Sequence, residues 1–354
     1  MASKIENNSQ TSESDKATDP GPDGEKAVPR TKGKVLVTGI AGFIGSHLAE
    51  ALIKKGYEVV GLLKPGENTR WIKNLPAKLI YGDITEKDSL YEAVSGVTHV
   101  YHLAAILSSP NPKMFYEINY KGTKNLVEVC LDSGINLKRF LFISSYKAMG
   151  PTSKEGIFNE EKPCHPIDDY GRSKLLAEQF LHSLNGQLPF TVVRFPLVYG
   201  PRNFTGGIYL IFKLLNKGIR VNFESEFSVG FVNDVVNGTI LACESPLSIG
   251  KTYIIGENKI YTSNEIMSII ENALEKKRGR LTIPTSLLRL ATFIIKWYAK
   301  ITGTNPVTTS KGMDNPYWRY DMSKAETDLG FKAKIPLKEG ARLTAAWYKK
   351  EGII

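Results

Sequence analysis

From Gly33 onward, the chain alternates short apolar runs with amphipathic stretches. The apolar runs predict strands at residues 35–37, 58–63, 78–81, 97–102, 139–144 and 190–195. The amphipathic stretches predict helices at residues 43–55, 114–133 and 170–184. Apolar strands separated by helices are typical of a parallel sheet that is covered on both faces. We therefore expect an α/β fold built on a doubly wound parallel sheet, which binds its ligands at the carboxyl ends of the strands.

The pattern becomes less regular after about Pro196. Loops containing Gly, Asn and Pro alternate with helical patterns near residues 208–217, 264–276, 285–301 and 337–350. We expect a first domain at residues 33–195, to which residues 231–256 return. A smaller, mainly helical lobe that binds the substrate is expected from residues 196–230 and 257–354. Residues 1–32 are polar and lack apolar periodicity, which predicts a disordered tail.

The chain has 354 residues and a formal net charge of +10. Its lysines and arginines are scattered, so we favour a generally basic surface over a nucleic-acid-binding site. The cysteines lie far apart without a CxxC pair, which predicts neither a disulfide framework nor a metal site. The polar N-terminus does not resemble a signal peptide, and no run reaches the roughly 18 apolar residues of a membrane-spanning helix. The expected location is the cytoplasm.

A glycine turn follows the first predicted strand, in the run Thr38-Gly39-Ile40-Ala41-Gly42-Phe43-Ile44-Gly45. The first glycine permits a sharp turn, the second lets the backbone approach a pyrophosphate, and the third lets the helix pack on the strand. The helix N-terminus offers free N–H groups and a partial positive charge to the phosphates. The motif predicts a Rossmann-type dinucleotide site with contacts from Gly39, Gly42, Phe43, Ile44 and Gly45.

The end of the second predicted strand bears on the choice of cofactor. An acidic residue about 20 positions beyond the glycine turn would bind the ribose 2′-hydroxyl of NAD, whereas a basic residue suits the 2′-phosphate of NADP. The strand at 58–63 carries no acid at its tip and is followed by Lys64. We therefore expect NADP, with NAD as the alternative if Lys64 is only a solvated surface charge.

Candidate catalytic groups lie further along the chain. Tyr170 and Lys174 are spaced i and i+4, so they share one face of the predicted helix. A nearby ammonium and the positive oxidised nicotinamide both favour the phenolate and would lower the tyrosine pKa. The pair could then exchange a proton with a substrate while the nicotinamide exchanges hydride. Ser144 and Ser145 end a predicted strand at the expected ligand edge, where a hydroxyl could hold the substrate oxygen.

Together these motifs resemble the extended branch of the short-chain dehydrogenase/reductase superfamily, the NAD-dependent epimerase/dehydratase family. The resemblance covers nearly all of residues 34–353 and makes Ser145 the catalytic hydroxyl beside Tyr170 and Lys174. It also implies cofactor contacts from Asp83, Ile84, Leu103, Ala104, Ala105, Asn119, Ser144, Pro196 and Val198. For His102 we favour a structural role at a strand end over proton transfer. The resemblance is compatible with a homodimer.

Two further features of the sequence bear on the substrate. Sugar epimerases of this family usually carry an arginine, which grips the diphosphate, ahead of the segment equivalent to residues 231–234. Here the expected position is apolar, near Phe227, and two acidic residues lie close by, which would serve a diphosphate poorly. Arg202 or Arg220 could substitute. The apolar helix predicted at 287–298 resembles that of dihydroflavonol reductases and hydroxysteroid dehydrogenases; it could line an apolar pocket, contact a membrane surface through Lys296 and Lys300, or simply pack.

Three functional hypotheses follow from these residues. The leading one is an NADP(H)-preferring alcohol dehydrogenase or carbonyl reductase that acts on a moderately hydrophobic small molecule. The first alternative is a nucleotide-sugar epimerase or dehydratase, which retains its NAD and shows no net redox. The second is a non-catalytic dinucleotide-binding sensor, although such relatives typically lose the tyrosine or the lysine.

Overall fold

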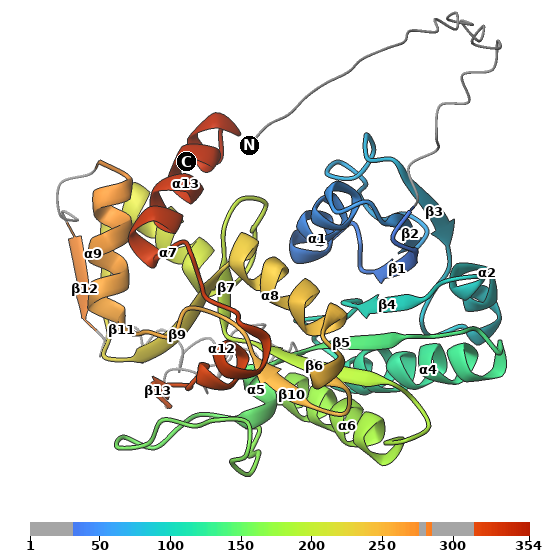
Figure 1. Ribbon diagram of the computed structural model, residues 1–354. Helices are drawn as coiled ribbons and strands as arrows, with labels where there is room; N and C mark the ends of the chain where they lie inside the picture. The colour runs from blue at the N-terminus through green and yellow to red at the C-terminus, as the bar shows by residue number, and fades with distance from the viewer. Residues whose placement is uncertain (1–30, 276–280, 285–314) are drawn as a thin grey trace, which may run out of the picture. The chain divides into compact units, whose positions relative to one another are not determined.

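A seven-stranded parallel sheet lies at the centre of the residues that the structure, a computed structural model, describes: 31–275, 281–284 and 315–354. Its strands run in the order β10-β6-β5-β4-β1-β2-β3 (Figure 1). They are β1 (Lys34–Thr38), β2 (Glu58–Leu63), β3 (Ala77–Tyr81), β4 (His99–His102), β5 (Arg139–Ser145), β6 (Phe190–Phe195) and β10 (Thr252–Ile254). The expected doubly wound α/β fold is confirmed. The predicted helix at 285–301 and nearly all of the predicted tail lie outside the described residues.

Helices connect the strands and cover both faces of this sheet. They are α1 (Phe43–Lys54), α2 (Tyr91–Val94), α3 (Lys113–Phe115), α4 (Gly122–Asp132), α5 (Tyr146–Met149), α6 (Asp169–Ser183) and α8 (Val232–Glu244), with the single-turn segments η1 (Lys87–Leu90) and η3 (Pro246–Ser248) and the π-helix η2 (Tyr116–Lys121). The helix predicted at 114–133 is thus α3, η2 and α4 in succession. The other two predicted helices of this region correspond to α1 and α6.

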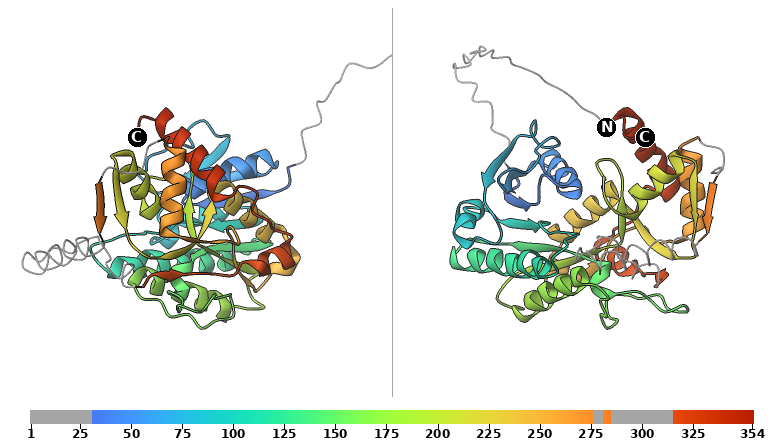
Figure 2. Two further views of the ribbon diagram at one scale, coloured as in Figure 1. Left: turned by 90° about the vertical axis from the view of Figure 1, so that its left-hand side faces the viewer. Right: turned by 180° about the vertical axis from the view of Figure 1, so that it is seen from behind.

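Alternate residues of each strand belong to opposite faces, which explains why most of the strands contain continuous apolar runs. Val35 and Val37 belong to a core cluster with residues of α1 and α8. Leu36, between them, belongs to a second cluster with residues of α4 and α6. Figures 1 and 2 show α1 and α8 on one side of the sheet and α4 and α6 on the other. Because both faces are buried, polar side chains that serve a ligand are confined to the strand ends.

The strand order reverses at β1, which lies between β2 and β4. Such a switch point opens a crevice at the carboxyl ends of the strands, where open α/β sheets bind ligands. The two segments at the switch are tied together, because the backbone N–H groups of Leu103 and Ala104 both donate to Thr38 Oγ1 at 3.1 Å. The glycine turn after β1 and the segment after β4 therefore form one continuous edge.

The second part of the chain adds two small sheets. β7 (Leu197–Tyr199), β9 (Glu226–Phe231), β11 (Ile260–Thr262) and β13 (Tyr317–Trp318) form one, and β8 (Ile219–Asn222) pairs with β12 (Leu281–Pro284). The helices here are α7 (Gly206–Asn216), α9 (Ser263–Ala273), α12 (Ser323–Leu329) and α13 (Leu337–Lys350). α7, α9 and α13 match predicted helices. The strands were not predicted, because most are too short for a period-two pattern, although β9 does alternate apolar and polar residues.

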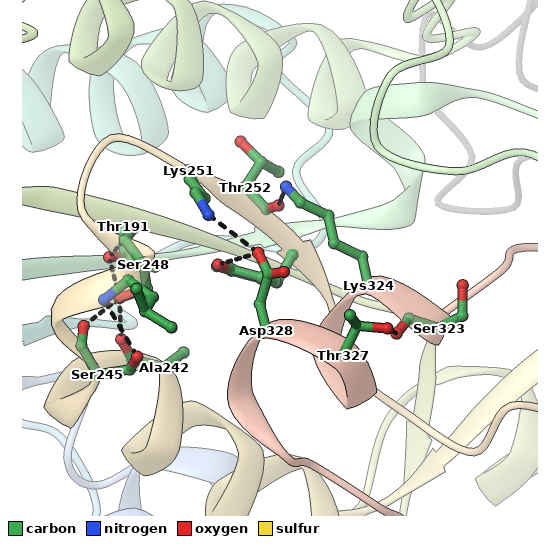
Figure 3. A network of polar contacts seen from close by, with 12 residues as sticks. Thr191, Ala242, Ser245, Ser248, Lys251, Thr252, Ser323, Lys324, Thr327 and Asp328 are labelled. Atoms are coloured by element: carbon green, nitrogen blue, oxygen red, sulfur yellow. Dashed lines mark hydrogen bonds and ion pairs between the residues drawn. The ribbon is translucent and has the colours of Figure 1, made fainter.

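A polar network joins α12 to the edge strand β10 of the central sheet (Figure 3). Lys324 Nζ donates to the carbonyl oxygen of Thr252 at 2.7 Å, and Lys251 Nζ lies 3.1 Å from Asp328 Oδ2. The C-terminal segment is therefore attached directly to the sheet that carries the glycine turn. None of the helices among the described residues combines the length and apolar character needed to cross a bilayer.

Candidate active site

The glycine turn has the geometry of a phosphate-binding cradle. Gly39 has a φ of 68°, and a β-carbon there would lie 3.0 Å from the backbone nitrogen of Ala104. α1 begins at Phe43 after an N-cap glycine, Gly42, without a side-chain cap and without an acidic residue in its first turn. Its N-terminal N–H groups are therefore available to an anion. These features fit the pyrophosphate of a dinucleotide.

Further predicted cofactor residues lie at the strand ends along this edge. Phe43 and Ile44 in α1, Leu103, Ala104 and Ala105 after β4, and Val198 in β7 are half-buried, whereas Gly45, Ile84 and Pro196 are buried. Ile84 packs against Gly122, and a β-carbon added to Gly122 would lie 2.8 Å from the Ile84 side chain. The structure thus brings together residues that are up to about 160 positions apart in sequence, as expected for the carboxyl edge of one parallel sheet.

Lys64 and Asp83, which were predicted separately, form an ion pair. Lys64 follows β2, Asp83 follows β3, and their Nζ and Oδ2 atoms lie 2.7 Å apart. Asp83 Oδ1 also accepts hydrogen bonds from the Thr85 N–H and hydroxyl, both at 2.9 Å. Although partial burial raises it, the pKa of Asp83 is lowered overall by these hydrogen bonds and by Lys64. Any group that binds Lys64 here therefore competes with a carboxylate.

Asn119 lies in the π-helical segment η2 and joins two parts of the site. Its Oδ1 accepts from the Ile106 N–H at 2.9 Å, and its Nδ2 donates to the Ile106 carbonyl at 3.1 Å and to Ser173 Oγ at 3.0 Å. Ser173 belongs to α6, the helix of the predicted catalytic pair. Single π turns inside helices are frequent at functional sites. Asn119 therefore fixes the segment after β4 relative to α6.

The predicted catalytic residues meet where β5 ends and α6 begins. A side-chain hydrogen bond links Ser145 to Tyr170, and Ser145 Oγ also accepts from the Lys147 N–H at 3.2 Å. Lys174 is buried, with its Nζ 4.0 Å from the centroid of the Phe142 ring. The tyrosine is half-buried and therefore accessible, whereas the ammonium is enclosed behind it.

Burial dominates the protonation of the tyrosine and the lysine. It raises the pKa of Tyr170 to about 12, against the opposing hydrogen bond from Ser145. It lowers the pKa of Lys174 to about 7, against the opposing charge of Glu178. The sequence analysis expected a lower tyrosine pKa from the lysine together with the positive oxidised nicotinamide, and this stays a prediction for the cofactor-bound site.

Ser144 faces a buried ion pair that the sequence analysis missed. Its hydroxyl donates to Glu178, whose Oε2 also accepts from Arg194 Nη2 at 2.6 Å. The hydroxyl predicted to contact the cofactor is therefore used within the protein. The sequence contained one signal for this buried carboxylate: Glu178 follows Lys174 by four residues, so the two side chains share one face of the helix.

His102 is buried between two threonines, with Nδ1 2.7 Å from Thr38 Oγ1 and Nε2 2.9 Å from Thr123 Oγ1. Burial lowers its pKa to about 3. A neutral imidazole with both nitrogens occupied accords with the structural role that we favoured. Within the described part of the chain, no group of three or more His, Cys, Asp or Glu side chains is arranged to hold a metal ion.

Comparison with known families supports this geometry. The model of the NAD dependent epimerase/dehydratase family matches residues 35–256. The chain belongs to this family. The predicted resemblance to extended short-chain dehydrogenases is therefore confirmed, and a nicotinamide dinucleotide is the class of cofactor that the family uses.

Relatives within the NAD-dependent epimerase/dehydratase family differ in activity. The UDP-glucose 4-epimerase of Vibrio cholerae is 27% identical over 339 residues, which span 91% of this chain and 96% of the relative. The human sterol-4-alpha-carboxylate 3-dehydrogenase, decarboxylating, is 30% identical over 251 residues, spanning 68% of this chain and 65% of the relative. The crystal structure of the Thermotoga maritima UDP-glucose 4-epimerase with UDP-glucose superposes with a TM-score of 0.75 at 26% identity, covering 90% of this chain and 99% of that one.

The arginines considered as diphosphate ligands are both engaged inside the protein. Arg202 Nη2 lies 2.6 Å from Glu50 Oε1, and its guanidinium lies 5.5 Å from the centroid of the Trp71 ring. Arg220 Nη1 lies 2.6 Å from Glu271 Oε2. In both arginines a carboxylate already engages one Nη and offsets part of the charge that a diphosphate would use.

Proposed function

We propose that the protein is an NADP(H)-preferring alcohol dehydrogenase or carbonyl reductase that acts on a moderately hydrophobic small molecule. The observation that carries this proposal is the aromatic environment next to Ser145. Tyr146 follows this serine directly and contacts Trp318 edge-on, with ring centroids 5.0 Å apart. Phe227 packs against the apolar cluster that contains Trp318. The family resemblance predicts the arginine of sugar epimerases near this position. Aromatic rings suit an apolar substrate better than a diphosphate.

In the proposed reaction, each residue of the site has one task. Tyr170 exchanges a proton with the substrate oxygen, and Ser145 holds that oxygen by a hydrogen bond. The nicotinamide, when bound, exchanges hydride with the substrate carbon. Lys174 lies on the same helix as Tyr170 and can change its protonation state near neutral pH, because burial lowers its pKa to about 7. Residues 33–195 would hold the dinucleotide, while residues 196–230 and 257–354 would shape the substrate pocket.

The preference for NADP(H) rests on Lys64. Its side chain is 57% exposed at the end of β2, so it can reach a phosphate in solvent. The ion pair with Asp83 also offsets a carboxylate that would otherwise repel a 2′-phosphate. A lysine at this position is therefore more useful to NADP than to NAD.

Substitution of the tyrosine tests the proposed chemistry. Oxidation of NADPH would be followed at 340 nm with a panel of cyclic and aryl ketones. Tyr170→Phe removes the proton donor and should lower kcat by about 100-fold or more. The control is Tyr91→Phe, which alters an exposed tyrosine on α2 and should leave the rate unchanged. Undiminished turnover by Tyr170→Phe would show that this residue is not the acid/base.

The nucleotide-sugar epimerase hypothesis is the second candidate, supported by the full-length similarity to UDP-glucose 4-epimerases. Such an enzyme retains its cofactor through purification. Interconversion of UDP-glucose and UDP-galactose without turnover of free NADPH would favour it. Reduction of ketones by added NADPH, with no action on UDP-glucose, would favour the dehydrogenase instead.

A further inference from the structure

Lys147 connects the two segments that carry the proposed catalytic groups. Its backbone N–H donates to Ser145 Oγ at 3.2 Å. Its side chain turns to the other segment, where Nζ lies 2.8 Å from Asp168 Oδ2. The two side chains of this ion pair are 31% and 12% exposed, so the pair is only partly screened by solvent. One residue thus contacts both the serine and the start of the tyrosine helix.

Asp168 in turn determines where α6 begins. It is the N-cap of the helix, and its Oδ1 accepts from the Gly171 N–H at 2.8 Å. Gly171 packs so tightly on α5 that a β-carbon there would clash with the carbonyl oxygen of Lys147. The first turn of α6, which contains Tyr170, is therefore fixed by its own cap and is held to α5 by an ion pair and a close backbone contact.

The charge of Asp168 also acts on the tyrosine. Burial is the largest cause of the raised pKa of Tyr170, and the carboxylate of Asp168 raises it further. The phenol also packs against Phe115 of α3, with ring centroids 6.3 Å apart, and titratable or charged groups lie on three neighbouring elements. They are Asp168, Asp169 and Lys174 on α6 and its cap, Tyr146 and Lys147 on α5, and Tyr116 on η2, which donates to Asp169 Oδ1 at 2.9 Å. Lys147 is the cation among them that directly contacts the Asp168 carboxylate.

We propose that Lys147 and Asp168 form a positioning pair for the reaction, which holds Ser145 in register with Tyr170 and offsets the charge of the carboxylate that caps the tyrosine helix. The inference rests on the proposed role of Tyr170 as acid/base. Lys147 acts through the serine and the aspartate, and it needs no contact with substrate.

Two substitutions should shift the pH dependence in opposite directions. Lys147→Met leaves Asp168 charged and unpaired, so the basic limb of the rate of carbonyl reduction, where Tyr170 is the acid, should move to higher pH by about half a unit or more. Asp168→Asn keeps an N-cap oxygen but removes the charge, so the same limb should move to lower pH. Lys147→Arg should restore the wild-type profile, because it retains the ion pair. A shift of the same sign in both variants, or no shift in either, would overturn the proposal.

The matched control is Lys121→Met. Lys121 also forms an ion pair of 2.8 Å, with Glu117 on the π-helical segment, but it contacts neither Ser145 nor Asp168. Its substitution should leave kcat, KM and the pH profile unchanged. In Lys147→Met, kcat should fall by about tenfold while KM for NADPH changes by less than about twofold, because the glycine turn is intact. If Tyr170→Phe is inactive but Lys147→Met behaves like Lys121→Met, the positioning role fails and the proposed function stands.

Amide hydrogen exchange provides a readout that requires no substrate. The peptide covering residues 169–173 contains the Gly171 N–H that donates to Asp168. Loss of the ion pair should loosen this cap and speed exchange in that peptide by about threefold or more, whereas α4 should be unaffected. Unchanged exchange in Lys147→Met would contradict the positioning role even if no substrate had been found.

Discussion

Gly45 packs against Gly39 so closely that a β-carbon on Gly45 would clash with the carbonyl oxygen of Gly39. The first residue lies in the first turn of α1 and the second begins the sharp bend after β1. This contact brings the N-terminus of the helix close to the end of the strand, where the phosphates of a dinucleotide bind in this fold. The third glycine of the motif is therefore required by packing rather than by its φ angle.

Gly45→Ala should consequently disturb both stability and cofactor binding. The added methyl group has no free space, and overpacking of this kind costs about 1–3 kcal/mol of unfolding free energy. Gly207→Ala is the matched control, because a β-carbon there meets no atom within 4 Å. Urea denaturation and titration of NADPH fluorescence would measure the two effects. Equal behaviour of the two variants would show that the turn can relax around a side chain.

Most of the central sheet could be predicted because most of its strands contain continuous apolar runs. Six of its seven strands were expected, whereas β10 has only three residues and was missed. The pairing of Lys64 with Asp83 could not be predicted, since the two residues follow different strands that only the sheet order makes neighbours. The same holds for Ser144, Glu178 and Arg194, whose contact depends on how α6 packs on β5 and β6.

The helix predicted at 114–133 shows a different limit of sequence reasoning. The sequence predicts a helix over this stretch, but not the π-helical segment within it. The side chain of Asn119 bonds to Ile106 and Ser173, which belong to distant parts of the chain. Helix propensity depends on the residues of the segment itself and not on contacts with distant parts of the chain. The π-helical segment, which occurs together with such contacts, could therefore not be predicted.

Lys64→Ala should weaken the use of NADPH more than that of NADH. The substitution removes the charge available to a 2′-phosphate and leaves Asp83 unpaired beside it, so both effects act against NADP. We expect kcat/KM for NADPH to fall by about tenfold or more, equivalent to about 1.4 kcal/mol, while the value for NADH falls less. The control is Lys78→Ala, which removes an ion-paired lysine from β3. Equal losses with both cofactors would contradict the proposed preference.

Asn119→Ala should destabilise the protein although the residue carries no charge. The change leaves the N–H and carbonyl groups of Ile106 without the partner that both now use. An unsatisfied buried polar group costs about 1–3 kcal/mol, and because the Ile106 groups are partly buried, a fall near the lower end of that range is expected in the unfolding free energy. Asn111→Ala, which alters an exposed turn, is the control. The measurement is urea denaturation, and identical midpoints for the two variants would argue against this role.

Lys174→Met should stabilise the protein in a manner that depends on pH. The folded-state pKa of about 7 lies below the ordinary lysine value of 10.5. Between these two pH values the unfolded chain binds more protons at this residue than the folded chain does. The unfolding free energy of the wild type therefore increases as the pH rises. The advantage of the methionine variant should therefore be largest at or below pH 7 and should shrink above it, with a limiting slope of about 1.4 kcal/mol per pH unit.

Unfolding free energies of wild type and Lys174→Met, measured in urea at pH 6, 7, 8 and 9, would test this linkage. Lys121→Met is the control, because its ion-paired side chain is 59% exposed and its effect should vary little over the same range. Parallel curves for wild type and Lys174→Met would mean that the buried lysine keeps its ordinary pKa. It would then remain a full cation at neutral pH, and its charge would favour the phenolate of Tyr170 as the sequence analysis first expected.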